Sequence, residues 1–255
     1  NGLTSLLIKE LKKKKIHLIE DVCESHGASF KNKKLGSYGL ISNFSFYYAH
    51  HMSTIEGGMI CTNNKKIYQT LRMLRSHGLV REISDIKMRK SYIKKYNNLN
   101  EEFIFKYPSY NVRNTEINAV IGINQLKQLD KNIIKRNINH QIFLNNIDSK
   151  KFFTNFDLKG SSNYAFNLIL KKRNFNFVQK LMKGMRKEGI EFRRGSAGGG
   201  NQLRQPYIKK YLKKNHFKHF PNTEHIHFFG FYIGNYPDLQ KNDIIKLCKL
   251  INAIK

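Results

Sequence analysis

The chain has 255 residues, of which 40% are hydrophobic and 12% aromatic, so it can bury a substantial core and is not a disordered polymer. Lysine and arginine (46) outnumber aspartate and glutamate (18), which gives a formal net charge of +28. Because the basic residues are spread through the chain, we interpret this charge as a compositional bias and expect no specific nucleic acid or membrane partner, although a polyanionic substrate would benefit from it.

The three cysteines, Cys23, Cys61 and Cys248, are few and far apart, which indicates neither a disulfide framework nor a CxxC metal site and fits a reducing cytoplasm. The apolar stretches are far shorter than the roughly 20 residues of a membrane helix, and the first 15 residues lack a signal-peptide core, so we expect a soluble protein. The chain begins with Asn1 and enters a helix-like segment at once, from which we expect an N-terminal portion to be absent.

The first part of the chain alternates helices with short strands. Helical spacing predicts a helix over 6–11, and the apolar run 16–19 predicts a buried strand that ends in the acidic pair Glu20 and Asp21. Open α/β sheets place ligand-binding groups at the carboxyl ends of their strands, so this pair is a candidate site. Three more elements are predicted before residue 80, namely strands at 42–47 and 58–62 and a helix from 65 to about 76.

The charged stretch 81–106 is expected to be an irregular surface excursion, and the strongest helix prediction follows it. Thr115 and Glu116 suit a helix start. Apolar residues then recur at helical spacing at Ala119, Ile123, Leu126, Leu129 and Ile133. Turn-forming residues cluster near 145–160, which places a domain boundary there. Beyond it we predict a strand at 164–170, a helix from 175 to about 188, a Gly-rich loop at 195–200, a strand around 228–233 and a helix from 239.

Six motifs follow one another along most of the chain. They are the acidic-pair segment 19–28, the Gly-Ser-Tyr-Gly turn 36–39, the Phe-Ser-Phe segment 44–46, the segment 50–58 from His-His to Glu-Gly-Gly, and the short motifs 75–78 and 110–113. In order and spacing they resemble the DegT/DnrJ/StrS sugar aminotransferase family. The resemblance implies the α/β fold type I of pyridoxal-phosphate-dependent aminotransferases, here as part of the large cofactor-binding domain (1–145) and the smaller C-terminal α/β domain (146–255).

The resemblance implies a role for several motif residues. Asp21 would lie under the pyridine nitrogen of pyridoxal phosphate, where a carboxylate keeps that nitrogen protonated. Glu24 would lie near the ring oxygen of the cofactor, and Ser45 would hydrogen-bond its phosphate. Asn111 would reach the cofactor phosphate of a neighbouring subunit, since the family builds each site from two subunits of a homodimer. His50 takes the position of the lysine that binds the cofactor covalently in the family.

His50 changes the reaction that the resemblance implies. An imidazole cannot bind the cofactor aldehyde as lysine does, but it moves protons near neutral pH. The segment looks like that of the family's 3-dehydratase branch, in which glutamate converts the cofactor to pyridoxamine phosphate. The enzyme then removes the C3 hydroxyl of a nucleotide-linked 4-keto-6-deoxyhexose and releases ammonia, here with His50 as acid and base. Such 3-deoxy sugars enter surface polysaccharides.

Two further observations bear on the substrate. One type of 3-dehydratase holds an iron-sulfur cluster on clustered cysteines, but this chain has no cysteine between Cys61 and Cys248, so the resemblance favours the cluster-free type that acts on GDP-linked sugars. Arginines beside a Gly-rich loop suit a diphosphate. We therefore assign four residues around that loop to the nucleotide-sugar substrate, namely Arg193, Arg194, Asn201 and Arg204.

Each of these residues has a plainer interpretation. Asp21 and Asn111 also suit caps or turns, and Ser45 also suits an ordinary strand position. His50 and His51 also suit a solvent-facing loop, whereas a metal site is not indicated because no third ligand is evident. The loop glycines Gly198 to Gly200 also suit a flexible connection. His225 and His227 alternate and would share one face of a strand, as a structural pair.

Three other functions stay open. A sugar aminotransferase of the same family would need another lysine to reach the cofactor. A catalytically silent relative of the fold would bind a nucleotide-sugar or a partner subunit only. Nucleic-acid binding would rest on the +28 charge. The family normally carries a Ser-Gly-Thr phosphate loop and a stacking aromatic residue before the acidic pair, and neither occurs in this chain, so we expect a fragment or the product of a broken gene.

Overall fold

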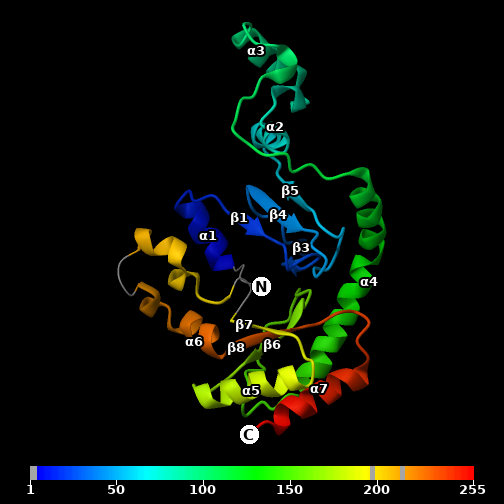
Figure 1. The fold of residues 1–255 in the computed structure, drawn as a ribbon, viewed down its shortest axis with the longest axis vertical. Coiled ribbons are helices and arrows are strands. Elements are labelled where there is room, and N and C mark those ends of the chain that lie inside the picture. Colours follow the sequence, from blue (N-terminus) through cyan, green and yellow to red (C-terminus); the bar gives the residue numbers. More distant parts are fainter. Residues whose placement is uncertain (1–4, 196–198, 213–215) are drawn as a thin grey trace. The chain divides into compact units, whose positions relative to one another are not determined.

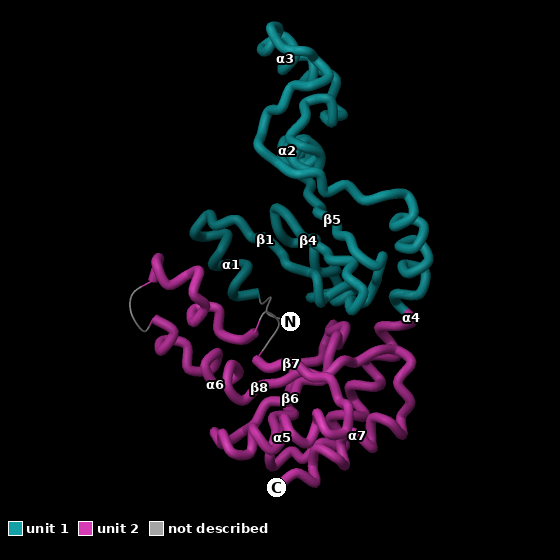
Figure 2. Tube along the Cα trace, viewed as in Figure 1, with its two compact units in different colours: residues 1–130 teal, residues 131–255 magenta. Residues whose placement is uncertain are grey.

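The structure is a computed structural model that describes residues 5–195, 199–212 and 216–255. The chain forms two compact units, residues 1–130 and 131–255 (Figure 2). The division lies inside the longest helix, α4 (Glu116–Asn146), whereas the turn-rich composition placed the expected boundary at 145/146. Among the helices of the described ranges, none is both long enough and apolar enough to cross a membrane.

Unit 1 begins with helix α1 (Ser5–Lys13) and is built on a three-stranded sheet (Figure 1). The strands, in the order β1-β4-β5, are β1 (Ile19–Asp21), β4 (Ile41–Ser45) and β5 (Gly58–Cys61). Strands β1 and β4 are parallel, so their carboxyl ends meet at one edge of the sheet, while β5 runs antiparallel to β4. A small antiparallel hairpin, β2 (Ser29–Phe30) and β3 (Lys33–Lys34), lies between β1 and β4 in the chain.

The first strand begins three residues later than predicted. The apolar run 16–19 was expected to be a buried strand, but Ile16 and Ile19 are exposed and β1 covers Ile19–Asp21. Its buried residue is Glu20, which is only 8% exposed. A carboxylate becomes buried at little cost when several backbone N–H groups donate to it, and Glu20 accepts three such bonds. The prediction was therefore wrong in register.

The stretch 81–106 is ordered, so the expectation of an irregular excursion was wrong. After α2 (Lys65–Leu74) the chain forms η1 (Val80–Glu82), α3 (Ile86–Lys95) and η2 (Glu101–Phe103). The side chain of Asp85 caps α3 by accepting the N–H of Met88 over 3.0 Å. Four buried residues form a small core beneath these elements, namely Met73, Val80, Ile83 and Ile104. The basic residues of α3 obscured this core in the sequence.

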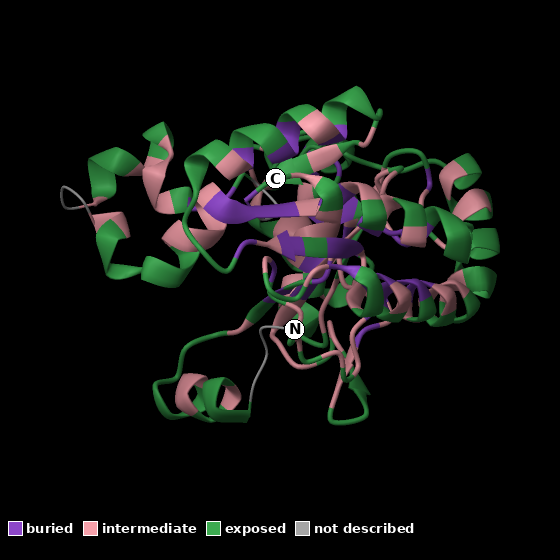
Figure 3. Cartoon of the chain, turned by 90° about the horizontal axis from the view of Figure 1, so that it is seen from below, coloured by how far each residue is buried: buried purple, intermediate pink, exposed green. Residues whose placement is uncertain are grey.

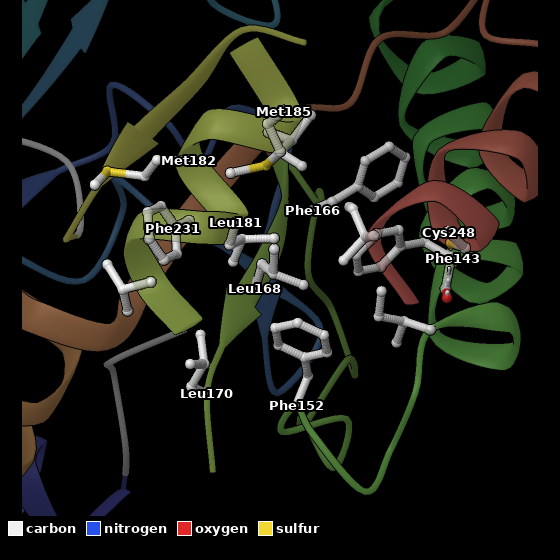
Figure 4. Packing of buried hydrophobic residues seen from close by; sticks show 14 of the residues in the cluster. Phe143, Phe152, Phe166, Leu168, Leu170, Leu181, Met182, Met185, Phe231 and Cys248 are labelled. Carbon is white, nitrogen blue, oxygen red and sulfur yellow. Dashed lines mark hydrogen bonds between the residues drawn. The ribbon is translucent and has the colours of Figure 1, made fainter. Parts of the chain in front are cut away.

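Unit 2 is a three-stranded antiparallel sheet packed against helices. The strands, in the order β6-β8-β7, are β6 (Ala165–Ile169), β8 (Gly230–Gly234) and β7 (Phe192–Arg194). The helices are α5 (Phe175–Lys187), α6 (Pro221–Phe229) and α7 (Lys241–Ala253), with short 3-10 turns η3 (Gln202–Arg204), η4 (Pro206–Tyr211) and η5 (His216–His219). Phe166 and Leu168 of β6 point towards Leu181 and Met185 of α5 and Phe143 of α4 in the core (Figure 4).

Two differences from the sequence predictions occur in unit 2. The strand expected around 228–233 is β8, which begins at Gly230, and Phe228 belongs to α6. Pro221 at the first helical position and Glu224 in the first turn favour a helix there. His225 and His227 are therefore helical, and the idea that they share a strand face was wrong. Buried positions in both units are shown in Figure 3.

Most predicted elements are confirmed within a few residues. The helices expected over 6–11, from 65, from Thr115 and Glu116, from 175 and from 239 correspond to α1, α2, α4, α5 and α7. The strands expected at 42–47, 58–62 and 164–170 correspond to β4, β5 and β6.

Candidate functional site

Asp21 lies at the carboxyl end of β1 with its side chain exposed. Parallel pairing sets it opposite Asn43, whose amide donates to Oδ1 over 3.0 Å, and the backbone N–H of Cys23 donates to the same oxygen over 3.1 Å. The pKa of Asp21 is lowered, first by a hydrogen bond from the side chain of Cys23 and further by the backbone of Cys23, the side chain of Asn43 and the charge of His50. Partial burial opposes these effects on the pKa without cancelling them. At neutral pH this edge of the sheet therefore presents an ionised carboxylate.

Ser45 ends β4 at the same edge, two residues beyond the partner of Asp21. Its hydroxyl oxygen accepts the backbone N–H of Tyr47 over 3.3 Å, and its carbonyl oxygen lies 3.3 Å from Nδ1 of His50. The backbone N–H of His50 donates to the carbonyl of Tyr47 over 3.0 Å, which closes a turn. The five-residue spacing thus folds the imidazole back onto the last residue of the strand.

The surroundings of His50 suit a base. A carbonyl oxygen only accepts hydrogen bonds, so the contact with Ser45 favours the tautomer that carries its proton on Nδ1 and its lone pair on Nε2. The half-buried ring makes edge contacts with Tyr47 (centroids 5.7 Å apart) and His26 (6.4 Å). It also lies close enough to Asp21 to influence the pKa of that carboxyl. Asp21, Ser45 and His50 are therefore brought together, as their motifs predicted.

The segment 50–58 is fixed at its far end by β4 and by the first turn of α4. The backbone N–H of Thr54 donates to the carbonyl of Phe46 over 2.9 Å. The side-chain amide of Asn118 donates to the carbonyls of Thr54 (2.8 Å) and Glu56 (3.3 Å). The Thr54 hydroxyl also donates to the carbonyl of Glu56 over 2.7 Å. The Glu-Gly-Gly end of the segment is therefore held in place and anchors the loop that carries the imidazole.

Glu20 has a role that the sequence analysis missed. Its Oε1 accepts the backbone N–H groups of Tyr38 (2.7 Å) and Gly39 (2.6 Å), and its Oε2 accepts that of Gly36 (2.7 Å). One buried carboxylate thus holds the turn 36–39 against β1. The only signal in the sequence was the Gly-Ser-Tyr-Gly motif, which indicates a turn but not the acceptor that fixes it.

The turn after β1 carries Glu24, the residue expected near the cofactor ring oxygen. Its side chain is half-buried, three residues beyond Asp21. It lies near Cys23, whose pKa is raised to about 11, mainly by burial and by the hydrogen bond and charge of Asp21, with a contribution from Glu24. Two residues further along, His26 is buried. The segment that follows the acidic pair therefore contributes both half-buried and buried titratable groups.

Asn111 lies apart from these residues within unit 1. It forms an isolated bridge with Ser76, and its side-chain oxygen accepts Nε of Arg113 over 3.0 Å. Arg113 in turn lies 3.9 Å from the carboxylate of Glu82. In the part of the chain that the structure describes, no hydrogen bond or ring contact joins Asn111 to Asp21. Its predicted role at the site of a neighbouring subunit stays a prediction.

Arg193 and Arg194 lie on β7 in unit 2, and both are exposed. Nη2 of Arg194 donates to the carbonyl of Phe228 over 3.3 Å, which ties this strand to the end of α6. The Gly-rich loop follows, and of its glycines Gly198 lies outside the described residues. Both guanidinium groups belong to exposed residues in the strand that precedes this loop.

Asn201 and Arg204 lie at η3 and are both held by Glu224 of α6. The amide of Asn201 donates to the Glu224 carboxylate over 2.7 Å, and this asparagine is buried. The guanidinium of Arg204 forms a paired hydrogen bond with the same carboxylate through Nε and Nη2. It also stacks on Phe217 (3.9 Å to the centroid) and Phe228 (4.9 Å). Two of the three guanidinium nitrogen atoms of Arg204 therefore donate to Glu224. The sequence analysis did not identify Glu224 as this partner.

Comparison with known proteins agrees with the motif resemblance. The model of the DegT/DnrJ/EryC1/StrS aminotransferase family matches residues 7–252. The chain is 35% identical over 222 residues to GDP-4-keto-6-deoxy-D-mannose 3-dehydratase of Escherichia coli. These residues are 87% of this chain and 56% of that protein. It is 30% identical over 183 residues to UDP-4-amino-4,6-dideoxy-N-acetyl-beta-L-altrosamine transaminase of Campylobacter jejuni, which covers 70% and 44%.

A solved structure gives the same result for the fold. The structure of the E. coli GDP-4-keto-6-deoxy-D-mannose 3-dehydratase with bound hydrated pyridoxal phosphate superposes with a TM-score of 0.80 at 32% identity, over 96% of this chain and 62% of that one. The chain thus spans less than two thirds of the length of these relatives. The predicted α/β fold of the pyridoxal-phosphate-dependent aminotransferases, fold type I, is confirmed for the part that it spans. The chain belongs to the DegT/DnrJ/EryC1/StrS aminotransferase family.

Proposed function

We propose that the protein containing this chain removes the C3 hydroxyl of a nucleotide-linked 4-keto-6-deoxyhexose, using pyridoxal phosphate, its pyridoxamine form and glutamate as the amino donor. The observation that carries this proposal is His50, an imidazole folded onto Ser45 and placed within electrostatic reach of Asp21. The 3-dehydratase relative, 35% identical, supports it. A GDP-linked sugar and a place in surface-polysaccharide synthesis follow from the same likeness.

The residues of the sheet edge fit the cofactor. A protonated pyridine nitrogen needs an anion beside it, and Asp21 is an exposed carboxylate whose pKa is lowered. The hydroxyl of Ser45 accepts from Tyr47 and keeps its own O–H for a phosphate oxygen. When bound, the cofactor supplies an electron sink for the reacting carbon. We assign Glu24 to its ring oxygen and Asn111 to the phosphate of a partner subunit.

In this proposal His50 moves protons. Because Nδ1 donates its hydrogen bond to the carbonyl of Ser45, Nε2 is the atom that accepts a proton from the reacting carbon. The same proton can then pass from Nε2 to the departing C3 hydroxyl, which leaves as water. Asp21, as an anion nearby, stabilises the imidazolium between these two events. One imidazole therefore serves as both base and acid.

We assign the nucleotide-sugar diphosphate to Arg193 and Arg194, whose side chains are exposed on β7. Forked guanidinium donors match phosphate oxygens. Asn201 and Arg204 complete this set, with Glu224 fixing their orientation at η3. Replacement of Arg193 by Ala is expected to raise the KM for the nucleotide-sugar with little change in kcat, which steady-state kinetics would measure.

We further propose a homodimer in the cytoplasm. The first half of α4 exposes a row of apolar side chains, namely Ile117, Val120, Ile123 and Leu126, each more than half exposed, which a partner subunit would cover. Sedimentation equilibrium is expected to give twice the mass of the protomer, and a monomer at micromolar concentration would contradict this. All three cysteines are free thiols, which suits a reducing compartment.

The reaction is tested with the holoprotein that contains this chain, supplied with pyridoxal phosphate, glutamate and a GDP-linked 4-keto-6-deoxyhexose. We expect ammonia and a 3-deoxy sugar in equal amounts. His50→Asn should lower kcat by at least about a hundredfold, the usual contribution of a general acid or base. His17→Asn is the matched control because His17 is exposed before β1. Cofactor binding without ammonia release would refute the proposal.

The transaminase relative, 30% identical, favours a sugar aminotransferase as the second candidate. That function needs a lysine bound to the cofactor, and position 50 carries an imidazole. Borohydride reduction followed by peptide mass spectrometry distinguishes the two. A cofactor-labelled lysine together with an amino-sugar product would establish the aminotransferase, and a 3-deoxy product without labelled lysine would establish the dehydratase.

A further inference from the structure

The ring of His26 lies buried among the segments that carry the site. It is 2% exposed and comes from the turn after β1, five residues beyond Asp21. It packs against Phe44 and Phe46, the residues on either side of Ser45, with centroid separations of 5.7 and 6.0 Å. One ring therefore joins the end of β1 to the end of β4.

The same ring also contacts the loop that carries the imidazole. Its centroid lies 6.4 Å from that of His50 in a T-shaped contact, and 5.7 Å from that of His51 in a tilted one. Tyr47 makes a second T-shaped contact with His50, and the two interplanar angles are both 72°. The hydrogen bond between His50 and the Ser45 carbonyl spans 3.3 Å, and these ring contacts act beside it on the orientation of the His50 ring.

Hydrogen bonding does not account for His26. Among the described residues neither Nδ1 nor Nε2 of this ring has a partner. Burial, with a smaller effect of His50, lowers the pKa of His26 to about 4, so the ring is neutral at pH 7. A buried polar atom without a hydrogen-bond partner destabilises the folded chain. What the ring provides at this place is therefore a flat aromatic surface.

We propose that His26 is a positioning residue whose buried ring fixes the orientation of His50 against the strand end that carries Ser45. The inference rests on the proposed function, because the orientation of Nε2 matters only if that atom transfers a proton. The aromatic ring of His26, and not its nitrogen atoms, would orient His50. A side chain of similar volume without a ring would remove this aromatic contact and so loosen the restraint on the χ2 angle of His50.

Two variants separate ring from nitrogen. His26→Phe removes the two ring nitrogens but keeps an aromatic ring. His26→Leu removes the nitrogens and the aromatic ring together. The first readout is a set of NMR spectra and needs no turnover. The holoprotein that contains this chain is labelled at histidine 13Cε1, and the His50 signal is assigned by its loss in His50→Asn. We expect one sharp His50 signal in the wild type and in His26→Phe, and a shifted and broadened one in His26→Leu.

The second readout is turnover of the holoprotein under the conditions given above. His26→Phe should keep kcat within about threefold, and His26→Leu should lower kcat about tenfold or more with KM unchanged, because misplacement of a catalytic group affects the chemical step. Circular dichroism checks folding in each case. If His26→Leu does not fold, His26→Gln replaces it as the variant without an aromatic ring.

An unchanged His50 signal and unchanged kcat in a folded His26→Leu protein would overturn the inference. Equal loss in His26→Phe and His26→Leu would also overturn it, because the role would then belong to the nitrogens. A wild-type holoprotein that releases no ammonia, while its His50 signal responds to His26→Leu, would refute the proposed function and leave the ring contact intact. The two failures are therefore distinguishable.

Discussion

Adjacent carboxylates on β1 have opposite surroundings. Glu20 is 8% exposed and accepts three backbone N–H groups, whereas Asp21 is exposed at the strand end and accepts from Asn43 and Cys23. The alternation of side chains along a strand explains the difference, because neighbouring residues point to opposite faces. One carboxylate therefore holds a turn, and the next is left to meet a ligand.

Glu20→Gln should destabilise the protein by about 1–3 kcal/mol, the usual effect of leaving a buried polar group unsatisfied. The amide oxygen can replace Oε1 towards Tyr38 and Gly39, but the NH2 group would then face the N–H of Gly36, donor against donor. Urea unfolding measures the change. Glu101→Gln is the control, since Glu101 is exposed in η2, and an equal effect of the two substitutions would contradict the role of Glu20.

For single residues, the sequence predicted which side chains belong to the site better than it predicted their hydrogen-bond partners. The spacing of Asp21, Ser45 and His50 was sufficient to bring them together, because parallel strands align their carboxyl ends. The capture of Arg204 by Glu224 was not predicted, since the two lie 20 residues apart and belong to different elements. Partners of this kind depend on tertiary packing, which a pattern of residue types does not encode locally.

Among the elements, the segment from Gly78 to Tyr107 shows how a charged stretch folds. Its small core is closed where the two ends meet, with the backbone N–H of Lys106 donating to the carbonyl of Gly78 over 2.8 Å. Gly78 has φ +76°, and a Cβ there would lie 1.9 Å from the carbonyl oxygen of Tyr107. The close approach of two backbones requires glycine at this position.

Gly78→Ala should therefore destabilise unit 1 by more than about 2 kcal/mol, since strain at positive φ is joined by a clash with backbone. Gly189→Ala is the matched control, because Gly189 has φ +67° but no atom within 4 Å of an added Cβ, so only the strain of about 1 kcal/mol remains. Thermal unfolding of both variants measures the difference. Equal shifts in Tm would show that the contact with Tyr107 does not close the segment.

The elements that were predicted correctly are those with a clear apolar period or a cap. In α4 the period from Ala119 to Ile133 predicted the helix, but its buried continuation consists of Arg136, Asn139, His140 and Phe143, which are mostly polar. The run from Phe228 to Ile233 was likewise predicted to be a strand, although its first two residues, Phe228 and Phe229, end α6. Apolar content alone does not distinguish a buried helix end from a strand.

Each of the two units buries a neutral histidine. Unit 1 contains His26, and unit 2 contains His140, which is 1% exposed and packs against Phe143, Phe156 and Phe166. Burial lowers the pKa of each to about 4. In the described part of the chain the ring nitrogens of His140 also have no hydrogen-bond partner. Acid should therefore weaken both units, and it acts on a chain whose formal charge is already +28.

The expected loss follows from proton linkage. The unfolded chain binds a proton at His140 near pH 6.5 and the folded unit only near pH 4, so between these values the unfolded state holds more protons and stability falls as pH falls. The full shift corresponds to about 3 kcal/mol, all present above pH 6.5 and lost by pH 4. His140→Leu should make the free energy of unfolding less dependent on pH between 6.5 and 4. His17→Leu, at an exposed position, should leave that dependence unchanged, and an unaltered slope in His140→Leu by urea unfolding at a series of pH values would show that this histidine does not sense acid.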